Sequence, residues 1–170
     1  MLFRSHKTYK GTVSHDKKHI IVNGQAIKVF AERMPDRLPW AALNIDVVIE
    51  ATGKFVTKSK AMKHIEGSGA KKVIISAPAK GQSNGIKYIV LGVNNELIDK
   101  KDLVISNSSC TTNNVAPLIK ILDENWGIEK GFITTVHSYT QDQNLLDGNH
   151  KDLRRGRDRK STRLNSSHRL

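Results

Sequence analysis

Short apolar runs separated by turn residues dominate the first two thirds of the chain. The runs 19–22 and 26–30 flank the segment Asn23-Gly24-Gln25, whose Asn-Gly pair is a strong signal for a β-hairpin. A helical pattern covers 59–66 and is closed by Gly67 and Gly69. Further apolar runs predict strands at 46–50, 72–76, 88–92 and 103–105.

A second helix follows the last of these strands. Val115, Leu118, Ile119 and Leu122 recur at helical spacing and form one apolar stripe. The segment 132–140 then reads as a further strand. Because strands alternate with helices, we predict an α/β fold with a parallel, doubly wound sheet.

The only cysteine, Cys110, stands where the strand pattern gives way to this second helix. Unpaired N–H groups and the helix dipole favour a thiolate at such a helix start. A nearby imidazole, such as that of His137 in the segment 132–140, would lower the thiol pKa further and could carry a proton. The alternatives are an inert buried cysteine and a histidine that only satisfies hydrogen bonds on a strand. Polar residues throughout 106–113 favour a reactive thiol over a core residue.

Residues just beyond strand ends are the next candidates. In a parallel sheet a dinucleotide lies across the carboxyl ends of the strands. Thr52-Gly53, Ser76 and Cys110 each follow a predicted strand. An ordinary strand-ending turn remains the alternative for Thr52-Gly53.

Several segments together resemble the family of phosphorylating glyceraldehyde-3-phosphate dehydrogenases, and the resemblance extends from about Tyr9 to Arg157. It implies the later part of a doubly wound, Rossmann-like NAD-binding domain at 1–108, without its first βαβ unit, and the start of an α+β catalytic domain at 109–157. The segment 158–168 resembles a translated sequencing adapter, so we expect 158–170 to be an artefactual or disordered tail. The resemblance rests on the segments 50–53, 73–79, 92–94, 106–113, 116–118, 134–140, 146–148 and 151–155.

The resemblance also implies roles for individual residues. Cys110 would be the nucleophile and His137 the acid–base group. The attacking phosphate would be held by Ser109 and Thr111, and the phosphate of the substrate by Thr140 and Arg155. The residues implied to bind the cofactor are Arg33, Thr52, Gly53, Phe55 and Ser76. Arg33 could otherwise be one more surface charge.

The implied reaction is the NAD-dependent conversion of glyceraldehyde 3-phosphate and inorganic phosphate to 1,3-bisphosphoglycerate through a cysteine thioester. Erythrose-4-phosphate dehydrogenase is the alternative within the same chemistry, and a catalytically inactive fragment is a second alternative. NADP stays open as a cofactor, because the ribose-reading segment is not in the sequence. The family also implies a homotetramer. Without the opening βαβ unit, we expect this chain to have little or no dehydrogenase activity and to aggregate.

Composition narrows the picture further. The formal net charge is +12, but the tail after Arg157 contributes four basic residues against one acid, and few aromatic residues lie among the remaining lysines. We therefore expect a solvated basic surface and no specific nucleic-acid partner. No apolar run approaches the length of a membrane span, and one cysteine excludes an internal disulfide and a cysteine-built zinc site. A catalytic thiol is typical of the reducing cytoplasm, and no metal is expected.

Overall fold

The computed structural model describes residues 9–81, 85–138 and 167–169. The chain divides into two compact units. The first holds the described residues up to 89 together with 95–108, and the second holds 90–94 and the described residues from 109 onward.

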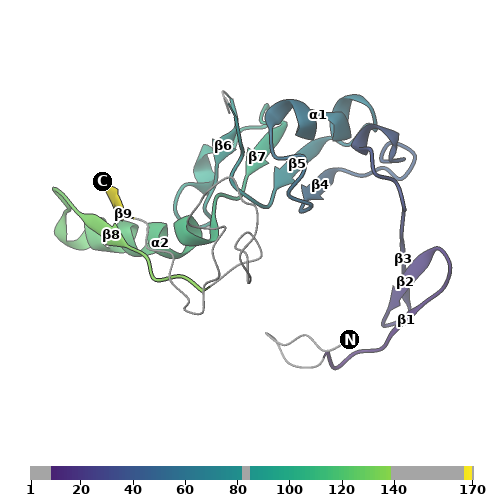
Figure 1. Ribbon diagram of the computed structural model, residues 1–170, viewed down its shortest axis with the longest axis horizontal. Helices are drawn as coiled ribbons and strands as arrows, with labels where there is room; N and C mark the ends of the chain where they lie inside the picture. Colours follow the sequence, from purple (N-terminus) through teal and green to yellow (C-terminus); the bar gives the residue numbers. More distant parts are fainter. Residues whose placement is uncertain (1–8, 82–84, 139–166, 170) are drawn as a thin grey trace, which may run out of the picture. The chain divides into compact units, whose positions relative to one another are not determined.

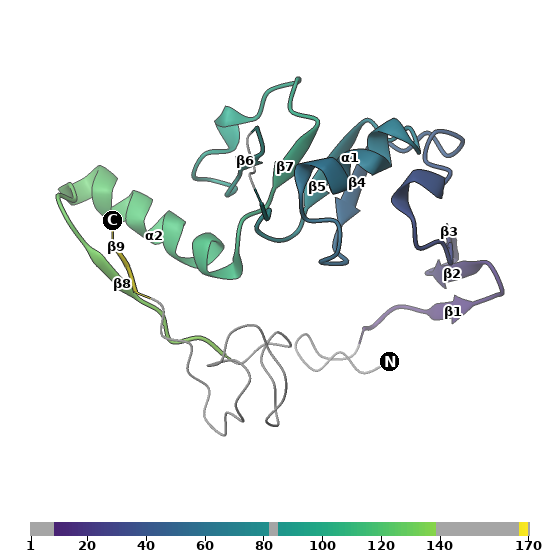
Figure 2. The same ribbon diagram turned by 45° about the horizontal axis from the view of Figure 1, so that its top comes forward.

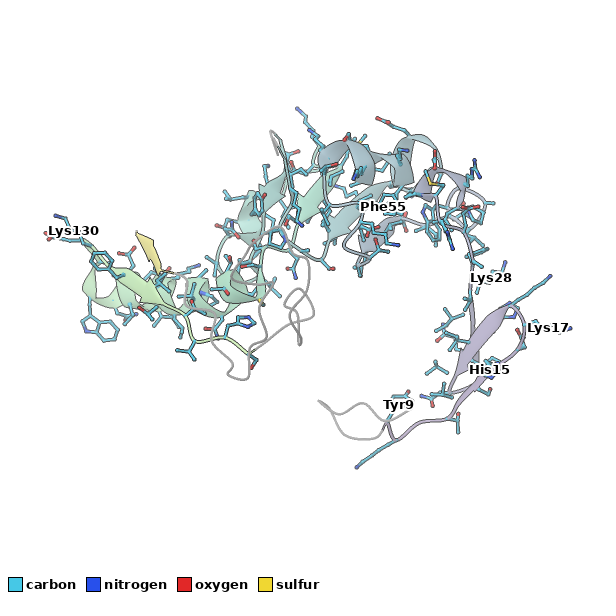
Figure 3. The ribbon with its side chains drawn as sticks, in the orientation of Figure 1. Tyr9, His15, Lys17, Lys28, Phe55 and Lys130 are labelled. Atoms are coloured by element: carbon cyan, nitrogen blue, oxygen red, sulfur yellow. The ribbon has the colours of Figure 1, made fainter. Side chains whose placement is uncertain are left out.

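A three-stranded antiparallel sheet opens the first unit. Its strands are β1 (Val13–His15), β2 (His19–Val22) and β3 (Gln25–Lys28). The predicted hairpin is confirmed, because Asn23 and Gly24 turn the chain with φ angles of 50° and 82°. Strand β1 was not predicted from the sequence. In Figure 3 the labels of His15, Lys17 and Lys28 mark this sheet. Beside it, the Asn23 side-chain amide donates to the Tyr9 hydroxyl at 2.9 Å.

The main sheet of the first unit is parallel. It contains β4 (Val47–Glu50), β5 (Lys72–Ile75), β6 (Lys87–Tyr88) and β7 (Val104–Ser106), in the order β4-β5-β7-β6 (Figure 1). All three strand pairings in this sheet are parallel. The α/β fold with a parallel sheet is therefore confirmed.

Helix α1 (Lys58–Glu66) packs against this sheet and builds the core. It begins where the Thr57 hydroxyl accepts a hydrogen bond from the Lys60 N–H, as expected of an N-cap threonine. Side chains on the face of the sheet away from α1 are more exposed to solvent, and Ile49 on that face is 67% exposed. The hydrophobic core consists of Val48, Val56, Ala61, Ala70, Val73, Ile75, Ile86 and Val104.

The second unit is built around helix α2 (Cys110–Trp126). Strand β8 (Phe132–Thr134) runs beside this helix (Figure 2) and pairs with β9 (Ser167–Arg169) in an antiparallel sheet. Leu118 and Leu122, on the predicted apolar stripe, remain 54% and 49% exposed. Strand β9 lies in the segment that the sequence predicts to be a disordered tail, so three residues of that segment have a regular backbone.

Two predicted strands end at least four residues earlier than expected. The run 88–92 forms a strand only up to Tyr88, because the chain turns at Val90. There the Asn94 side-chain oxygen accepts from the Val90 N–H at 2.7 Å, and the Val90 carbonyl accepts from the Val93 N–H at 3.0 Å. In the segment 132–140, strand β8 ends at Thr134, and residues 139 and 140 lie outside the described residues. Single helical turns occur at Pro35–Arg37 and Asn95–Leu97.

Among the described residues, no helix combines the length and apolar character that a membrane crossing requires.

Candidate active site

Cys110 occupies the first position of α2, as the sequence predicts. Ser109 precedes it as the N-cap residue, and its hydroxyl accepts a hydrogen bond from the Thr112 N–H at 3.0 Å. The N–H groups of the first helical residues have no carbonyl partner within a helix. The exposed thiol therefore lies at the positive end of the helix dipole.

His137 lies next to this thiol. Its Nε2 is 3.1 Å from the Cys110 Sγ, and its Nδ1 is 2.6 Å from the carbonyl oxygen of Ser138. Because that carbonyl can only accept, Nδ1 carries a proton and donates it. Nε2 is thereby left free to exchange a proton with the thiol. The structure thus brings together the two residues that the sequence singles out.

The two groups shift each other's titration. The hydrogen bond from His137 lowers the pKa of the Cys110 thiol, and hydrogen bonds from the Thr111 N–H and hydroxyl contribute in the same direction. The pKa of His137 is raised, first by the Ser138 carbonyl and then by the hydrogen bond to Cys110. Both shifts favour a thiolate and an imidazolium together.

A cleft of about 530 Å³ opens beside the pair. This volume lies within the range typical of small-molecule sites. Its wall combines the first two turns of α2 with the segment from β8 to Ser138 and includes both Cys110 and His137. Thr111 also lines the cleft, whereas the Ser109 hydroxyl is engaged in capping the helix. Thr140 and Arg155 lie outside the described residues.

The predicted cofactor residues lie in the first unit. The register places Glu50 beside Ile75 and Ile75 beside Ser106, so β4, β5 and β7 end at the same edge of the sheet. Thr52-Gly53 follows β4 at this edge, and Ser76 donates its N–H to the Glu50 carbonyl at 3.0 Å. Phe55 is half-buried in the loop that leads to α1 (Figure 3), and Arg33 is exposed between β3 and the turn at Pro35–Arg37.

Sequence reasoning missed a buried polar network beneath this edge. The Glu50 carboxylate lies against the His64 imidazole, and Trp40 donates its indole N–H to that ring. A glutamate closing an otherwise apolar strand was the one available signal, because buried carboxylates are rare unless they are paired. Among the described residues, no group of three His, Cys, Asp or Glu side chains could hold a metal ion.

Ser108, two residues before the thiol, has a buried hydroxyl that is expected to destabilise the fold. It is 5% exposed, its hydroxyl has no hydrogen-bond partner among the described residues, and its φ is 59°. Because an unpaired buried hydroxyl is unfavourable, Ser108→Ala is expected to raise the free energy of unfolding by about 1 kcal/mol in urea titrations. A loss of stability would contradict this and show that the hydroxyl has a partner in solution.

The parallel sheet, with its loops at the carboxyl edge, defines an α/β protein. In its second unit a thiol of lowered pKa stands at a helix start beside a histidine. Residues 4–58 match the family model for the glyceraldehyde 3-phosphate dehydrogenase NAD binding domain, and residues 109–163 match the model for the C-terminal domain of the same enzyme. The chain belongs to the glyceraldehyde-3-phosphate dehydrogenase family.

Curated relatives support this membership. Glyceraldehyde-3-phosphate dehydrogenase 2 of Streptomyces avermitilis is 57% identical over 149 residues, which cover 87% of this chain and 43% of the relative. The enzyme of Clostridium pasteurianum is 52% identical, covering 88% and 44%. The chloroplastic glyceraldehyde-3-phosphate dehydrogenase A of Scenedesmus vacuolatus is 54% identical, covering 84% and 44%. The chain thus spans less than half the length of these relatives.

Proposed function

We propose that this chain contributes the thiol site of an NAD-dependent dehydrogenase that oxidises and phosphorylates glyceraldehyde 3-phosphate. The observation that carries the proposal is the 3.1 Å contact between the Cys110 Sγ and the His137 Nε2 at the start of α2. The family membership supports the choice of substrate.

Cys110 acts as the nucleophile. Its thiolate adds to the aldehyde carbon, which forms a C–S bond and leaves negative charge on the aldehyde oxygen. The Cys110 N–H at the helix start is suited to stabilising this oxyanion. The protonated His137 first orients the thiolate and gives its Nε2 proton to this oxyanion, which forms the hemithioacetal hydroxyl. It then takes the proton back as the aldehyde carbon is oxidised.

The phosphate groups need donors around the thiol. Thr111 lines the cleft and presents a hydroxyl and an N–H at the helix start, where anions are favoured. Ser109 contributes by fixing that helix start. By family resemblance, Thr140 and Arg155 bind the phosphate of the substrate, since a guanidinium offers a planar fork of donors. Inorganic phosphate then attacks the thioester on Cys110 and releases the acyl phosphate.

The residues at the carboxyl edge of the sheet fit a dinucleotide. A Cβ added to Gly53 would meet no atom within 4 Å, so the backbone there is open to a ligand, and its φ of 72° favours glycine. Thr52, Phe55, Ser76 and Arg33 would complete the contacts. NAD, when bound, supplies the hydride acceptor for the oxidation.

The family relationship also supports a homotetramer in the cytoplasm as the working form of the whole enzyme. This assembly and this location are proposed together with the activity.

The proposal is tested through the thiol itself. Glyceraldehyde 3-phosphate is expected to protect Cys110 from iodoacetamide by forming the hemithioacetal, and glyceraldehyde without the phosphate is expected to protect it less. With NAD and phosphate present, any aldehyde-dependent NADH formation is expected to fall by on the order of 10³-fold or more in Cys110→Ser. Mass spectrometry reports the alkylation, and absorbance reports NADH.

Two outcomes would contradict the proposal. Equal protection of Cys110 by both aldehydes would show that the site does not recognise the phosphate group of the substrate. NADH formation that persists in Cys110→Ser would show that the Cys110 thiol is not required for the reaction. Erythrose 4-phosphate, assayed in parallel, reports which of the two sugar phosphates is preferred.

A further inference from the structure

A glutamate of the sheet and a histidine of helix α1 contact each other in the buried layer between these elements, next to the Thr52-Gly53 turn. Glu50, the last residue of β4, is 3% exposed, and His64 in α1 is 4% exposed. The Glu50 Oε2 and the His64 Nε2 are 3.2 Å apart. Such groups are rarely buried without a set of specific partners.

The partners fix the position of each proton. The Trp40 indole nitrogen can only donate, and it donates to the His64 Nδ1 at 3.1 Å. The proton of the imidazole therefore sits on Nε2 and is donated to Glu50. The other carboxylate oxygen accepts from the Thr52 N–H at 2.8 Å and from the Thr52 hydroxyl. Each partner of the carboxylate among the described residues is a donor, so these hydrogen bonds are all satisfied by this one arrangement of protons.

This network extends into the turn. The Thr52 hydroxyl oxygen also accepts from the Lys54 N–H at 3.2 Å, which closes the turn around Gly53. The ring of Phe55 meets the His64 ring edge-on, with centroids 6.3 Å apart. Two of the predicted cofactor residues, Thr52 and Phe55, are thus contacted directly by the buried pair.

We propose that Glu50 and His64 are positioning residues that hold the Thr52-Gly53 turn and Phe55 ready for the dinucleotide. The inference rests on the proposed function, because it assigns the pair to the cofactor site of that enzyme. A turn held in its bound conformation loses less conformational freedom when the ligand arrives, and this strengthens binding.

A buried pair of this kind is weak evidence for a contribution to stability. Replacing a buried ionic or polar pair by apolar residues of similar size is often neutral or stabilising. A merely structural pair would change the unfolding free energy but leave the turn and the affinity of the folded protein for NAD unchanged. The readouts that separate the two roles are therefore local amide exchange and NAD binding.

Glu50→Gln is the sharpest variant. The amide has one accepting oxygen, so it can serve either Thr52 or the His64 Nε2–H, and its NH₂ group then faces a donor. We expect the NAD dissociation constant to rise about tenfold by calorimetry, which corresponds to the loss of one hydrogen bond to a charged group. We also expect the Thr52 and Lys54 amides to exchange hydrogen faster in the ligand-free protein. The matched control is Glu66→Gln, which makes the same change at an exposed position of α1 and is expected to alter neither readout.

A second variant covers the case in which Glu50→Gln does not fold. Trp40→Phe keeps an aromatic ring but removes the donor to the His64 Nδ1, so the imidazole proton is free to change nitrogen. Nitrogen NMR is expected to show the His64 proton on Nε2 in the unaltered chain. In Trp40→Phe we expect a mixture of the Nδ1 and Nε2 tautomers and faster hydrogen exchange at the Thr52 amide.

The outcomes separate the two proposals. If the unaltered chain binds NAD and both variants fold and bind it equally well, the positioning role is wrong and the proposed function stands. If the unaltered chain does not bind NAD, the dinucleotide site is overturned, and the positioning role falls with it. Weakened binding together with faster exchange at Thr52, with Glu66→Gln unchanged, supports both.

Discussion

Replacing His137 with glutamine is expected to slow the alkylation of Cys110 by iodoacetamide at least about tenfold at about pH 6. The hydrogen bond from His137 is the largest of the effects that lower the thiol pKa. A lowered pKa keeps the thiolate populated below the ordinary pKa of cysteine, and each unit by which the pKa rises removes about nine tenths of the remaining thiolate at low pH. The rates of the two proteins are expected to converge at high pH, where both thiols are ionised.

The measurement is the alkylation rate as a function of pH, read by mass spectrometry. His15→Gln is the matched control, because His15 is an exposed histidine on β1 of the first unit. It is expected to leave the profile unchanged. An identical profile for His137→Gln would show that the helix start alone activates the thiol.

Truncating Ile75 to alanine is expected to lower the free energy of unfolding of the first unit by about 2–5 kcal/mol. Ile75 lies in the middle of the parallel sheet, between β4 and β7, and is 0% exposed. Its removal costs the transfer free energy of three carbons and leaves a cavity under α1. Urea unfolding followed by Trp40 fluorescence measures the change, with Trp126→Phe in both proteins so that only the first unit reports.

Ile49→Ala provides the comparison for this prediction. The side chain of Ile49 on β4 is 67% exposed, so the same truncation is expected to cost less than about 1 kcal/mol, mostly through β-propensity. Equal losses at Ile49 and Ile75 would mean that the open side of the sheet is covered in solution.

Local patterns predicted much of the first unit. The Asn-Gly pair predicts the hairpin because a tight two-residue turn requires positive φ angles at both of its central residues. Asn23 and Gly24 both have positive φ, and glycine adopts such angles without strain. The strands β4 and β5 and the helix α1 were predicted to within one residue, since each is an apolar run with clear turn residues on both sides. Strand β1 was not predicted, because Val13–His15 has only three residues and too few apolar positions to show a strand pattern. It is a strand because its backbone pairs with β2.

The same reasoning fails where side chains override the backbone pattern. Leu91 looks like a strand residue, yet it is 82% exposed, because the Asn94 side chain captures the Val90 N–H and the chain turns. An apolar run of this length cannot by itself distinguish a strand from a turn that a later side chain stabilises.

The sequence by itself determined that a lone cysteine stands at the start of a helix, since an apolar strand, a serine cap and a helical stripe are all local features. Only the tertiary structure decided that His137, which is 27 positions from Cys110, lies within 3.1 Å of its sulfur. It likewise decided that Trp40 and His64, 24 positions apart, order the carboxylate beneath the Thr52 turn. Local conformation follows from neighbouring residues, whereas the pairing of distant polar groups depends on which surfaces are buried together.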